Sequence, residues 1–375
     1  MSHPSPPALP RLSTDAELRG RFRGCLLGGA VGDALGAAVE FLTEEQIHAQ
    51  FGRGGIRDFA PAYGRIGAIT DDTQMTLFTA DGMLRAHVRA GGGRQPLQVA
   101  EVMSAAYQRW LKAIGLPHRT DAHERGAGWL MQHADLHHHR SPGRTCVPSL
   151  MAQQSAGEAA RNESKGCGGV MRIAPVGMYF AAMRGEAAPQ AAFDRGIEVA
   201  ALTHGHPSGQ LPAGFLAALV ASLLGGAALD EAAESAARRL RHRPHHEETL
   251  AHVEQARELA RRRPRDAGAL RELGAGWSAH EALAIGLYCA LGAIDFESAI
   301  VLAVNHGGDS DSTGSITGNI LGARWGAAAI PPRWLEPLEL RDAIGAIADD
   351  LATVAQWSFD DPREREFYAD RYPGH

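Results

Sequence analysis

Apolar residues recur at intervals of three or four along most of this chain, which is the spacing of one face of an α-helix. The stretch ITDDTQMTLFTADGMLRAHV, residues 69–88, shows the pattern clearly. Sustained two-residue alternation and Asn-Gly hairpins between β-branched runs are absent, so strands are not predicted. Further helices are predicted at residues 99–113, 122–135, 151–162, 190–203, 212–225, 247–263, 278–291 and 296–304, and after Ser312. The predicted fold class is all-α, with residues 14–372 in a single domain.

The first predicted helix carries a stripe of glycines. Four of them recur every four residues and share one helical face: Gly24, Gly28, Gly32 and Gly36. Glycine lowers helix propensity, so the stripe predicts that another backbone approaches closely. Asp33 and Glu40 lie seven residues apart, which is two helical turns, and are expected to share a face.

The composition is that of an ordinary soluble globular protein, with 375 residues, 45% hydrophobic and 21% charged. A net charge of −6 gives no reason to expect nucleic acid as a partner. Asp33 and Glu40 interrupt the apolar run at residues 24–42, so no membrane association is expected. Residues 1–13 are Pro-rich, lack the apolar core of a secretory signal and are predicted to be a disordered lead-in. The four cysteines are widely spaced, which favours a cytoplasmic protein with reduced thiols.

Two acidic motifs stand beside hydroxyl residues at predicted helix starts, one near each end of the chain. They are TDD, residues 70–72, and DSDS, residues 309–312. Each motif alone is explained by helix capping, because Asp and Ser are preferred N-caps. If the two helix starts converge, capping no longer explains the arrangement, since clustered carboxylates repel unless a cation lies between them. The motifs alone leave both interpretations open.

The candidate ligands in these motifs are hard oxygen atoms, which favours Mg²⁺, Mn²⁺ or Ca²⁺ over zinc. Their number exceeds what one magnesium ion usually takes from a protein, so two metal ions are predicted, a centre suited to hydrolysis. The string DSDST also matches the D-x-D-x-T nucleophile motif of haloacid-dehalogenase-like phosphatases, which gives a metal-dependent phosphohydrolase as an alternative. That motif should follow an apolar strand, whereas Asn-His-Gly-Gly precedes it here.

Two further stretches are candidates for substrate contact. The segment SKGCGGVMRIAP, residues 164–175, predicts either a cradle for phosphate or a tight turn. The segment LTHGHPSG, residues 202–209, contains a His-x-His pair. For His204 we expect substrate contact or helix capping rather than metal ligation.

Six motifs together resemble the ADP-ribosylglycohydrolase family: GCLLGGAVGDALGAAVEF, ITDDTQM, KGCGGVMR, LTHGHPSG, ALAIGLYCAL and VNHGGDSDSTGSITGNILGA. They follow in order between about Gly20 and Trp334. Their variants look most like the ADP-ribosylarginine hydrolases and the dinitrogenase-reductase-activating glycohydrolases of bacteria. The resemblance implies an all-α orthogonal helical bundle with a binuclear Mg²⁺ or Mn²⁺ centre in a cleft. Residues 226–270 match least, and a variable, charged excursion is expected there.

The resemblance also implies roles for individual residues. The metal ligands of the family match six positions: Thr70, Asp71, Asp72, Asp309, Asp311 and Ser312. Its substrate contacts match six others: Gly166, Cys167, Gly168, Gly169, Met171 and His204. Glu40 matches an acidic residue that approaches the metals, and Asp33 would orient the ligands from behind. Asp121 is the candidate for holding the guanidinium of a target arginine.

The implied activity is hydrolysis of the bond between the anomeric carbon of ADP-ribose and a protein side chain, with arginine as the expected linkage. The candidate catalytic residues are Asp72, Glu40 and Asp311. The expected partners are an ADP-ribosylated protein and ADP-ribose, and a monomer is expected. The alternatives are a serine-linked or O-acetyl-ADP-ribose hydrolase of the same family, the phosphohydrolase, and a binding protein without catalysis. The complete set of six ligand positions argues against the last of these.

Overall fold

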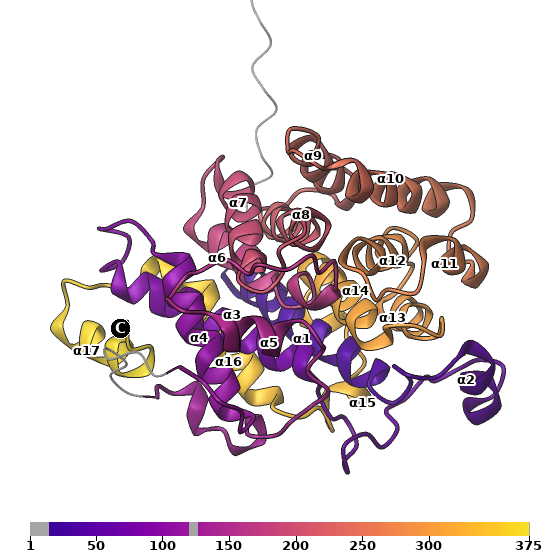
Figure 1. Ribbon diagram of the computed structural model, residues 1–375, viewed down its shortest axis with the longest axis horizontal. Helices are drawn as coiled ribbons and strands as arrows, with labels where there is room; N and C mark the ends of the chain where they lie inside the picture. Colours follow the sequence, from indigo (N-terminus) through magenta and orange to yellow (C-terminus); the bar gives the residue numbers. More distant parts are fainter. Residues whose placement is uncertain (1–14, 120–126, 375) are drawn as a thin grey trace, which may run out of the picture.

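A computed structural model of the protein describes residues 15–119 and 127–374 (Figure 1). Within those residues the fold consists of helices and their connections, with two isolated β-bridges and no strand. The all-α prediction is therefore confirmed. The α-helices are α1 (Asp15–Gly36), α2 (Glu44–Phe51), α3 (Asp71–Arg89), α4 (Val99–Ala113), α5 (Cys146–Ala152), α6 (Ala174–Met183), α7 (Ala188–Ala201), α8 (Pro207–Leu224), α9 (Leu229–Arg241), α10 (Glu247–Arg262), α11 (Ala267–Leu273), α12 (Ala279–Leu291), α13 (Phe296–Val304), α14 (Ser310–Trp325), α15 (Pro332–Leu335), α16 (Arg341–Thr353) and α17 (Pro362–Arg371). Short 3₁₀ helices are η1 (Leu130–Gln132), η2 (Ala134–Leu136), η3 (Cys167–Gly169), η4 (Ala327–Ala329) and η5 (Val354–Gln356).

Two helix predictions fail, and the first has a local cause. The helix expected at 151–162 is wrong, because α5 ends at Ala152. Side chains bond to the backbone of the following segment instead: Glu158 accepts the N–H of Gln154 at 2.8 Å, and Gln153 donates to the carbonyl of Glu158 at 2.9 Å. The second failure is the helix expected at 122–135. Its described part forms the 3₁₀ helices η1 and η2. The remainder of that helix lies outside the described residues, as does the lead-in predicted at 1–13.

The glycine stripe of α1 faces α14, at the centre of the molecule (Figure 1). A Cβ added at Gly28 or Gly32 would lie 2.5 or 2.0 Å from the carbonyl oxygen of Gly318 or Gly314. The close backbone approach predicted from the stripe is thus confirmed, and its partner is a second glycine-rich helix. Partner numbers fall along α14 as numbers rise along α1, so the two helices run antiparallel. The last glycine of the stripe consequently meets the first turn of α14, where the second acidic motif begins.

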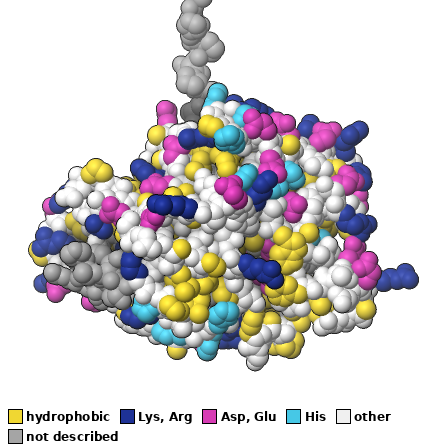
Figure 2. Space-filling view, viewed as in Figure 1, with side chains coloured by type: hydrophobic (Ala, Val, Ile, Leu, Met, Phe, Trp, Pro, Cys, Tyr) yellow, Lys and Arg dark blue, Asp and Glu magenta, His cyan; other side chains and the backbone are white. Residues whose placement is uncertain are grey.

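Other helices surround this central pair. α3 packs on α4 and α6, α7 packs on α8, and α12 packs on α10 and α14. α9, α10 and α11 lie along one edge of the molecule, and α17 lies at the opposite edge (Figure 1). The helix α8 is long and apolar enough to cross a membrane by composition alone, but 89% of its 18-residue window is buried inside the protein. On the face shown in Figure 2, acidic and basic side chains are interspersed, with groups of hydrophobic side chains between them.

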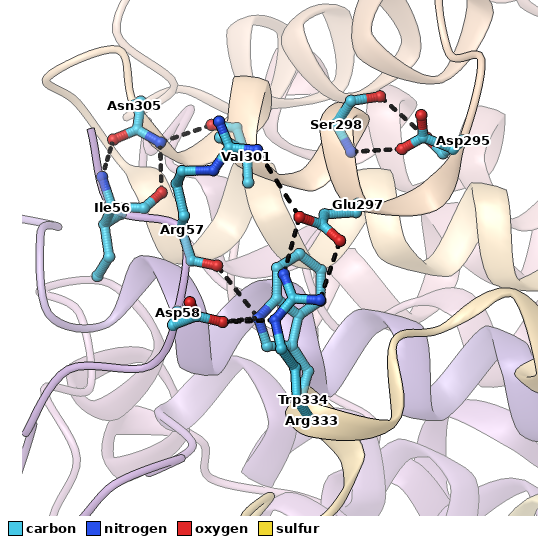
Figure 3. A network of polar contacts seen from close by, with 10 residues as sticks. All are labelled: Ile56, Arg57, Asp58, Asp295, Glu297, Ser298, Val301, Asn305, Arg333 and Trp334. Carbon is cyan, nitrogen blue, oxygen red and sulfur yellow. Dashed lines mark hydrogen bonds and ion pairs between the residues drawn. The ribbon is translucent and has the colours of Figure 1, made fainter. Parts of the chain in front are cut away.

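Helix α1 ends at Gly36, before Glu40. Residues 37–41 form turns after Gly36, so Glu40 does not share a helical face with Asp33, and that prediction is wrong. The chain then enters α2 through a capping box at its N-terminus. Beyond α2, the side chain of Asn305 accepts the N–H of Ile56 at 2.8 Å and donates to its carbonyl at 2.9 Å (Figure 3). The segment carrying Glu40 and α2 is therefore fastened to α13 as well as to α1.

A second anchor, also drawn in Figure 3, holds the segment that follows. Arg333 pairs with Asp58 at 2.7 Å and with Glu297 at 2.8 Å, and so joins this segment to α13 and α15. The indole N–H of Trp334 donates to the carbonyl of Arg57 at 3.2 Å. These contacts fix the backbone of the segment that connects α2 to α3.

Candidate metal and substrate site

The first acidic motif lies at the start of α3. Thr70 is the N-cap, and its hydroxyl accepts the N–H of Asp72 at 3.2 Å. The cap is therefore Thr70 rather than Asp71, and both aspartates of the motif occupy the first helical turn. The buried carboxylate of Asp33 accepts the N–H groups of Thr70 and Thr73 at 3.1 Å each, so α1 orients the start of α3 from behind.

The second acidic motif lies at the start of α14. Asp309 occupies the N-cap position, but its side chain makes no capping hydrogen bond. Its backbone N–H donates to the carbonyl of Ala275 at 2.8 Å, which fixes the approach to the helix. Asp311 is in the first turn and accepts the N–H of Ser312 at 2.9 Å. Helix capping thus explains why Thr70 stands at the start of α3. It does not explain why an aspartate stands at position 309.

The two helix starts converge on one pocket of about 500 Å³. Its lining includes five carboxylate side chains from three segments of the chain: Glu40, Asp71, Asp72, Asp309 and Asp311. Ser312 lines the same pocket, and Thr70 is completely buried beside it, with its hydroxyl against Asp311. The two motifs therefore meet, as expected. Whether their carboxylates serve as helix caps or as metal ligands depends on how their charges are compensated.

Burial and mutual repulsion raise the pKa values of these carboxyl groups. Loss of solvation, followed by the charges of Asp311 and Asp309, raises the pKa of Glu40 to about 10. Burial and the charge of Asp311 raise the pKa of Asp33 to about 7. The same two causes hold the pKa values of Asp71 and Asp72 well above the usual range of an aspartate. A cluster of this kind is unfavourable in its ionised state unless positive charge enters the pocket.

Several oxygen atoms of the cluster have no partner. One carboxylate oxygen each of Glu40, Asp72 and Asp309 is buried without a hydrogen bond, although buried polar atoms are normally satisfied. None of the ion pairs recorded between described residues involves these carboxylates. Hard divalent cations coordinate oxygen atoms of this type, so the donor set fits such cations.

The cluster is not a complete metal cage. Within residues 15–119 and 127–374, no three Asp, Glu, His or Cys side chains converge tightly enough to enclose an ion by themselves. A magnesium or manganese ion keeps several waters and takes only one or two protein carboxylates. A cation in this pocket would therefore also need ligands from hydroxyl groups and water.

The glycine-rich loop forms another side of the pocket. Its lining residues are Gly166, Cys167, Gly168 and Met171, whereas Gly169 is buried and does not line the pocket. A Cβ added at Gly168 would lie 2.6 Å from a sulfur atom, so this position has room only for glycine. The N–H of Cys167 donates to the carbonyl of Trp277 at 3.2 Å, and that of Gly166 donates to a serine hydroxyl. These two amides already donate hydrogen bonds within the protein. The phosphate cradle expected from the sequence therefore has fewer free N–H donors than its glycines suggest.

His204 also lines the pocket, and burial beside Arg172 lowers its pKa to about 3. Its Nδ1 atom is 2.8 Å from the hydroxyl of Thr203, and its Nε2 atom has no partner. It does not cap α8, because that cap is His206. The substrate-contact alternative for His204 therefore agrees with its place, and the capping alternative is wrong. Asp121 lies outside the described residues.

Sequence reasoning missed several pocket residues. The loop at 141–145 contributes a basic side chain, Arg144, and two aromatic side chains, Phe41 and Trp277, lie on the rim. No motif marks these positions, because each comes from an irregular segment. Sequence reasoning also missed Glu248 of α10, which pairs with Lys165 at 2.8 Å, immediately before the glycine-rich loop. The charged excursion thus contacts the segment that lines the pocket.

Comparison with known proteins agrees with this geometry. A family model described as ADP-ribosylglycohydrolase matches residues 14–360. The chain belongs to the ADP-ribosylglycohydrolase family. Members of the family act on ADP-ribosylated substrates, so the protein is a hydrolase of that class. The haloacid-dehalogenase-like interpretation of DSDST is wrong, because the helix α13, and not a strand, precedes the motif.

The alignments with named relatives cover most of the length of this ADP-ribosylglycohydrolase. It is 27% identical over 338 residues to the ADP-ribosyl-(dinitrogen reductase) glycohydrolase of Rhodospirillum rubrum, an alignment that covers 88% of this chain and 93% of the relative. It is 25% identical over 334 residues to the ADP-ribosylarginine hydrolase Tri1 of Pseudomonas putida, covering 88% and 77%. A solved structure described as an ADP-ribosylglycohydrolase-related protein complex superposes with a TM-score of 0.66 at 26% identity, covering 91% of this chain and 99% of that one.

Proposed function

We propose that the protein removes ADP-ribose from modified arginine side chains, and that the reaction requires two divalent cations, Mg²⁺ or Mn²⁺. One observation carries the proposal: two acidic motifs more than two hundred residues apart meet in a single pocket, with buried carboxylate oxygens that have no partner. The arginine linkage is supported by the name of the Pseudomonas putida relative and by the sequence variants of the motifs.

The cations would be held by six residues: Thr70, Asp71, Asp72, Asp309, Asp311 and Ser312. When bound, they would neutralise the carboxylates, hold ribose hydroxyls and lower the pKa of a water molecule. The neutralisation matters for this chain in particular, because at neutral pH its raised carboxyl pKa values would otherwise keep part of the cluster protonated. A protonated carboxyl group accepts neither a metal ion nor a proton from water.

The chain's own residues would then direct the proton and the substrate. A water oxygen adds to the anomeric carbon, the carbon–nitrogen bond breaks, and its electron pair goes to the guanidine. The proton leaves the water for a carboxylate, which is Asp72, Asp311 or Glu40, and returns to the departing guanidine. The transition state carries positive charge on the sugar ring, so the remaining carboxylates of the pocket would stabilise it.

Other pocket residues would hold the ADP part. Arg144 supplies positive charge on a wall of the pocket, which suits a diphosphate. Gly168 and Gly166 allow the substrate to approach their backbone closely. The unpartnered Nε2 atom of His204 offers a hydrogen bond to a hydroxyl or phosphate group. A monomer in the cytoplasm remains the expected setting.

The test is release of ADP-ribose from an arginine-ADP-ribosylated protein. We expect release in the presence of Mg²⁺ or Mn²⁺, none with EDTA, and recovery when metal is added back. A serine-ADP-ribosylated protein and O-acetyl-ADP-ribose, assayed in parallel, identify the linkage. Metal-independent release, or release only from a substrate other than arginine, would show the corresponding half of the proposal to be wrong.

A further inference from the structure

Two exposed aromatic side chains stand at the mouth of the pocket. Phe41 is 69% exposed and Trp277 is 46% exposed, and both belong to the pocket lining. Their rings are nearly parallel, with an interplanar angle of 17° and a centroid separation of 6.0 Å. Exposed aromatic surface contributes little to a folded core, and a pair of such rings beside a polar pocket is typical of a ligand-recognition surface.

The backbone beneath Trp277 is fixed on both sides. The carbonyl of Trp277 accepts the N–H of Cys167 at 3.2 Å, and the N–H of Ala279 donates to the carbonyl of Lys165 at 2.7 Å. The carbonyl of Ala275 accepts the N–H of Asp309 at 2.8 Å. The tryptophan thus stands on a loop tied both to the glycine-rich loop and to an acidic motif.

The backbone that follows Phe41 is held at two points. It lies in the turns between α1 and α2, and α2 begins with a capping box at Thr43. Just beyond α2, the Asn305 contacts of Figure 3 hold the backbone at Ile56. The two rings are therefore presented by anchored segments, which lowers the entropy cost of binding a ligand against them.

The pair lies on the acidic side of the pocket. Glu40 directly precedes Phe41, and a Cβ added at Gly276 would lie 3.2 Å from the Cβ of Asp309. The two rings line the same pocket as the carboxylates of Glu40 and Asp309, so a ligand group in that pocket can contact both kinds of side chain. A planar cation fits both features: a guanidinium stacks on aromatic rings and is attracted to carboxylates. A serine side chain has neither a planar face nor a charge.

We propose that Phe41 and Trp277 form an aromatic clamp for the guanidinium of the ADP-ribosylated arginine, and so set the preference for arginine over serine. This proposal rests on the proposed function and specifies how the same site recognises its target residue. The clamp would hold the leaving side of the substrate, while the ADP part lies in the pocket. The two residues would act on specificity and not on proton transfer.

The experiment distinguishes recognition of the arginine side chain from recognition of the ADP-ribose part of the substrate. Trp277→Ala, Phe41→Ala and Trp277→Phe are compared with wild type for kcat/KM on an arginine-ADP-ribosylated peptide. The dissociation constant of free ADP-ribose is measured on the same proteins by titration calorimetry with metal present. Phe367→Ala, which removes a 58% exposed aromatic ring outside the pocket, is the matched control.

We expect each alanine variant to lose roughly tenfold in kcat/KM through a higher KM, which is the scale of a stacked cation. Trp277→Phe should recover most of this loss, and the dissociation constant of ADP-ribose should change less than about twofold. Equal weakening of ADP-ribose binding would overturn the clamp, because the rings would then hold the ADP part. Unchanged kcat/KM in both alanine variants would overturn it as well, while leaving the arginine activity of wild type intact. If wild type itself does not cleave the arginine linkage, the proposed function fails, and the clamp fails with it.

Discussion

Helix α3 buries acidic side chains in two places, and they are neutralised differently. In its middle, Asp81 is 1% exposed by side chain and pairs with Arg85 at 2.7 Å and with Arg109 at 2.9 Å. At its start, Asp71 and Asp72 are also buried but share a pocket with three other carboxylates. Two arginines of the chain compensate the charge of Asp81. Among the described residues, no ion pair compensates the carboxylates of the pocket.

The difference separates a structural acid from a functional one. A buried ion pair holds its helices in place, because breaking it leaves an unpaired buried charge. A cluster of carboxylates without ion-pair partners serves no such purpose, and its members raise one another's pKa values. Burial does not distinguish the middle of α3 from its start, because the aspartates are buried in both places. The charge of the neighbouring side chains distinguishes them: arginines surround Asp81, and carboxylates surround Asp71 and Asp72.

The largest expected effect is on the structural acid. Asp81→Asn leaves two buried arginines facing an amide, so we expect the free energy of unfolding to fall by about 3–5 kcal/mol. The measurement is urea denaturation of the metal-free protein in EDTA at pH 8. The matched variant is Asp311→Asn, which removes one charge from the repelling cluster. It should leave stability unchanged or raise it. A comparable loss in both variants would mean that the pocket carboxylates are structural as well.

The next effect is on the dependence of stability on pH. Glu40 has a raised pKa of about 10 in the folded protein, so between pH 7 and 8.5 it holds a proton that the unfolded chain has already lost. Stability must therefore fall as pH rises, by about 2 kcal/mol over this interval, since each pH unit corresponds to about 1.4 kcal/mol. Asp33, with a pKa of about 7, adds to the loss at the lower end of the interval.

The interval is chosen so that the buried histidines do not interfere. The buried histidines His87, His204 and His306 have lowered pKa values of about 4, 3 and 4, so above pH 7 they are neutral in the folded protein and mostly neutral in the unfolded chain. Thermal denaturation in EDTA should show the loss, and Glu40→Gln and saturating Mn²⁺ should each reduce it. A metal-free wild type with constant stability from pH 7 to 8.5 would show that the cluster is not under electrostatic strain.

Much of this arrangement could be predicted from local sequence. Helical spacing and glycines every four residues depend on neighbours in the chain, so the α1 stripe and the two acidic motifs were visible without a structure. The cap at Thr70 and the termination of α5 at Ala152 were not predicted correctly, because side-chain hydrogen bonds decide them within a few residues. Helix periodicity carries no information about such bonds.

Contacts between distant irregular segments could not be predicted. Phe41 and Trp277 are more than two hundred residues apart in loops, and neither has a periodic pattern around it. The helix α10 looked like a solvated excursion, because its composition is highly charged. One of its charges, Glu248, nevertheless pairs with Lys165 and is bonded by the hydroxyl of Ser208. Composition describes the exposed face of such a helix and not its inner contacts.

The most direct measurement of the central claim is titration of the metal-depleted protein with Mn²⁺ in a calorimeter, comparing wild type, Asp311→Asn and Asp81→Asn at a temperature where all three are folded. We predict saturable binding of two ions by wild type, retained in Asp81→Asn and weakened at least tenfold in Asp311→Asn. Binding would then belong to the uncompensated pocket and not to buried acids in general. Absence of saturable binding by folded wild type, or equal binding by wild type and Asp311→Asn, would contradict the assignment of these carboxylates as metal ligands.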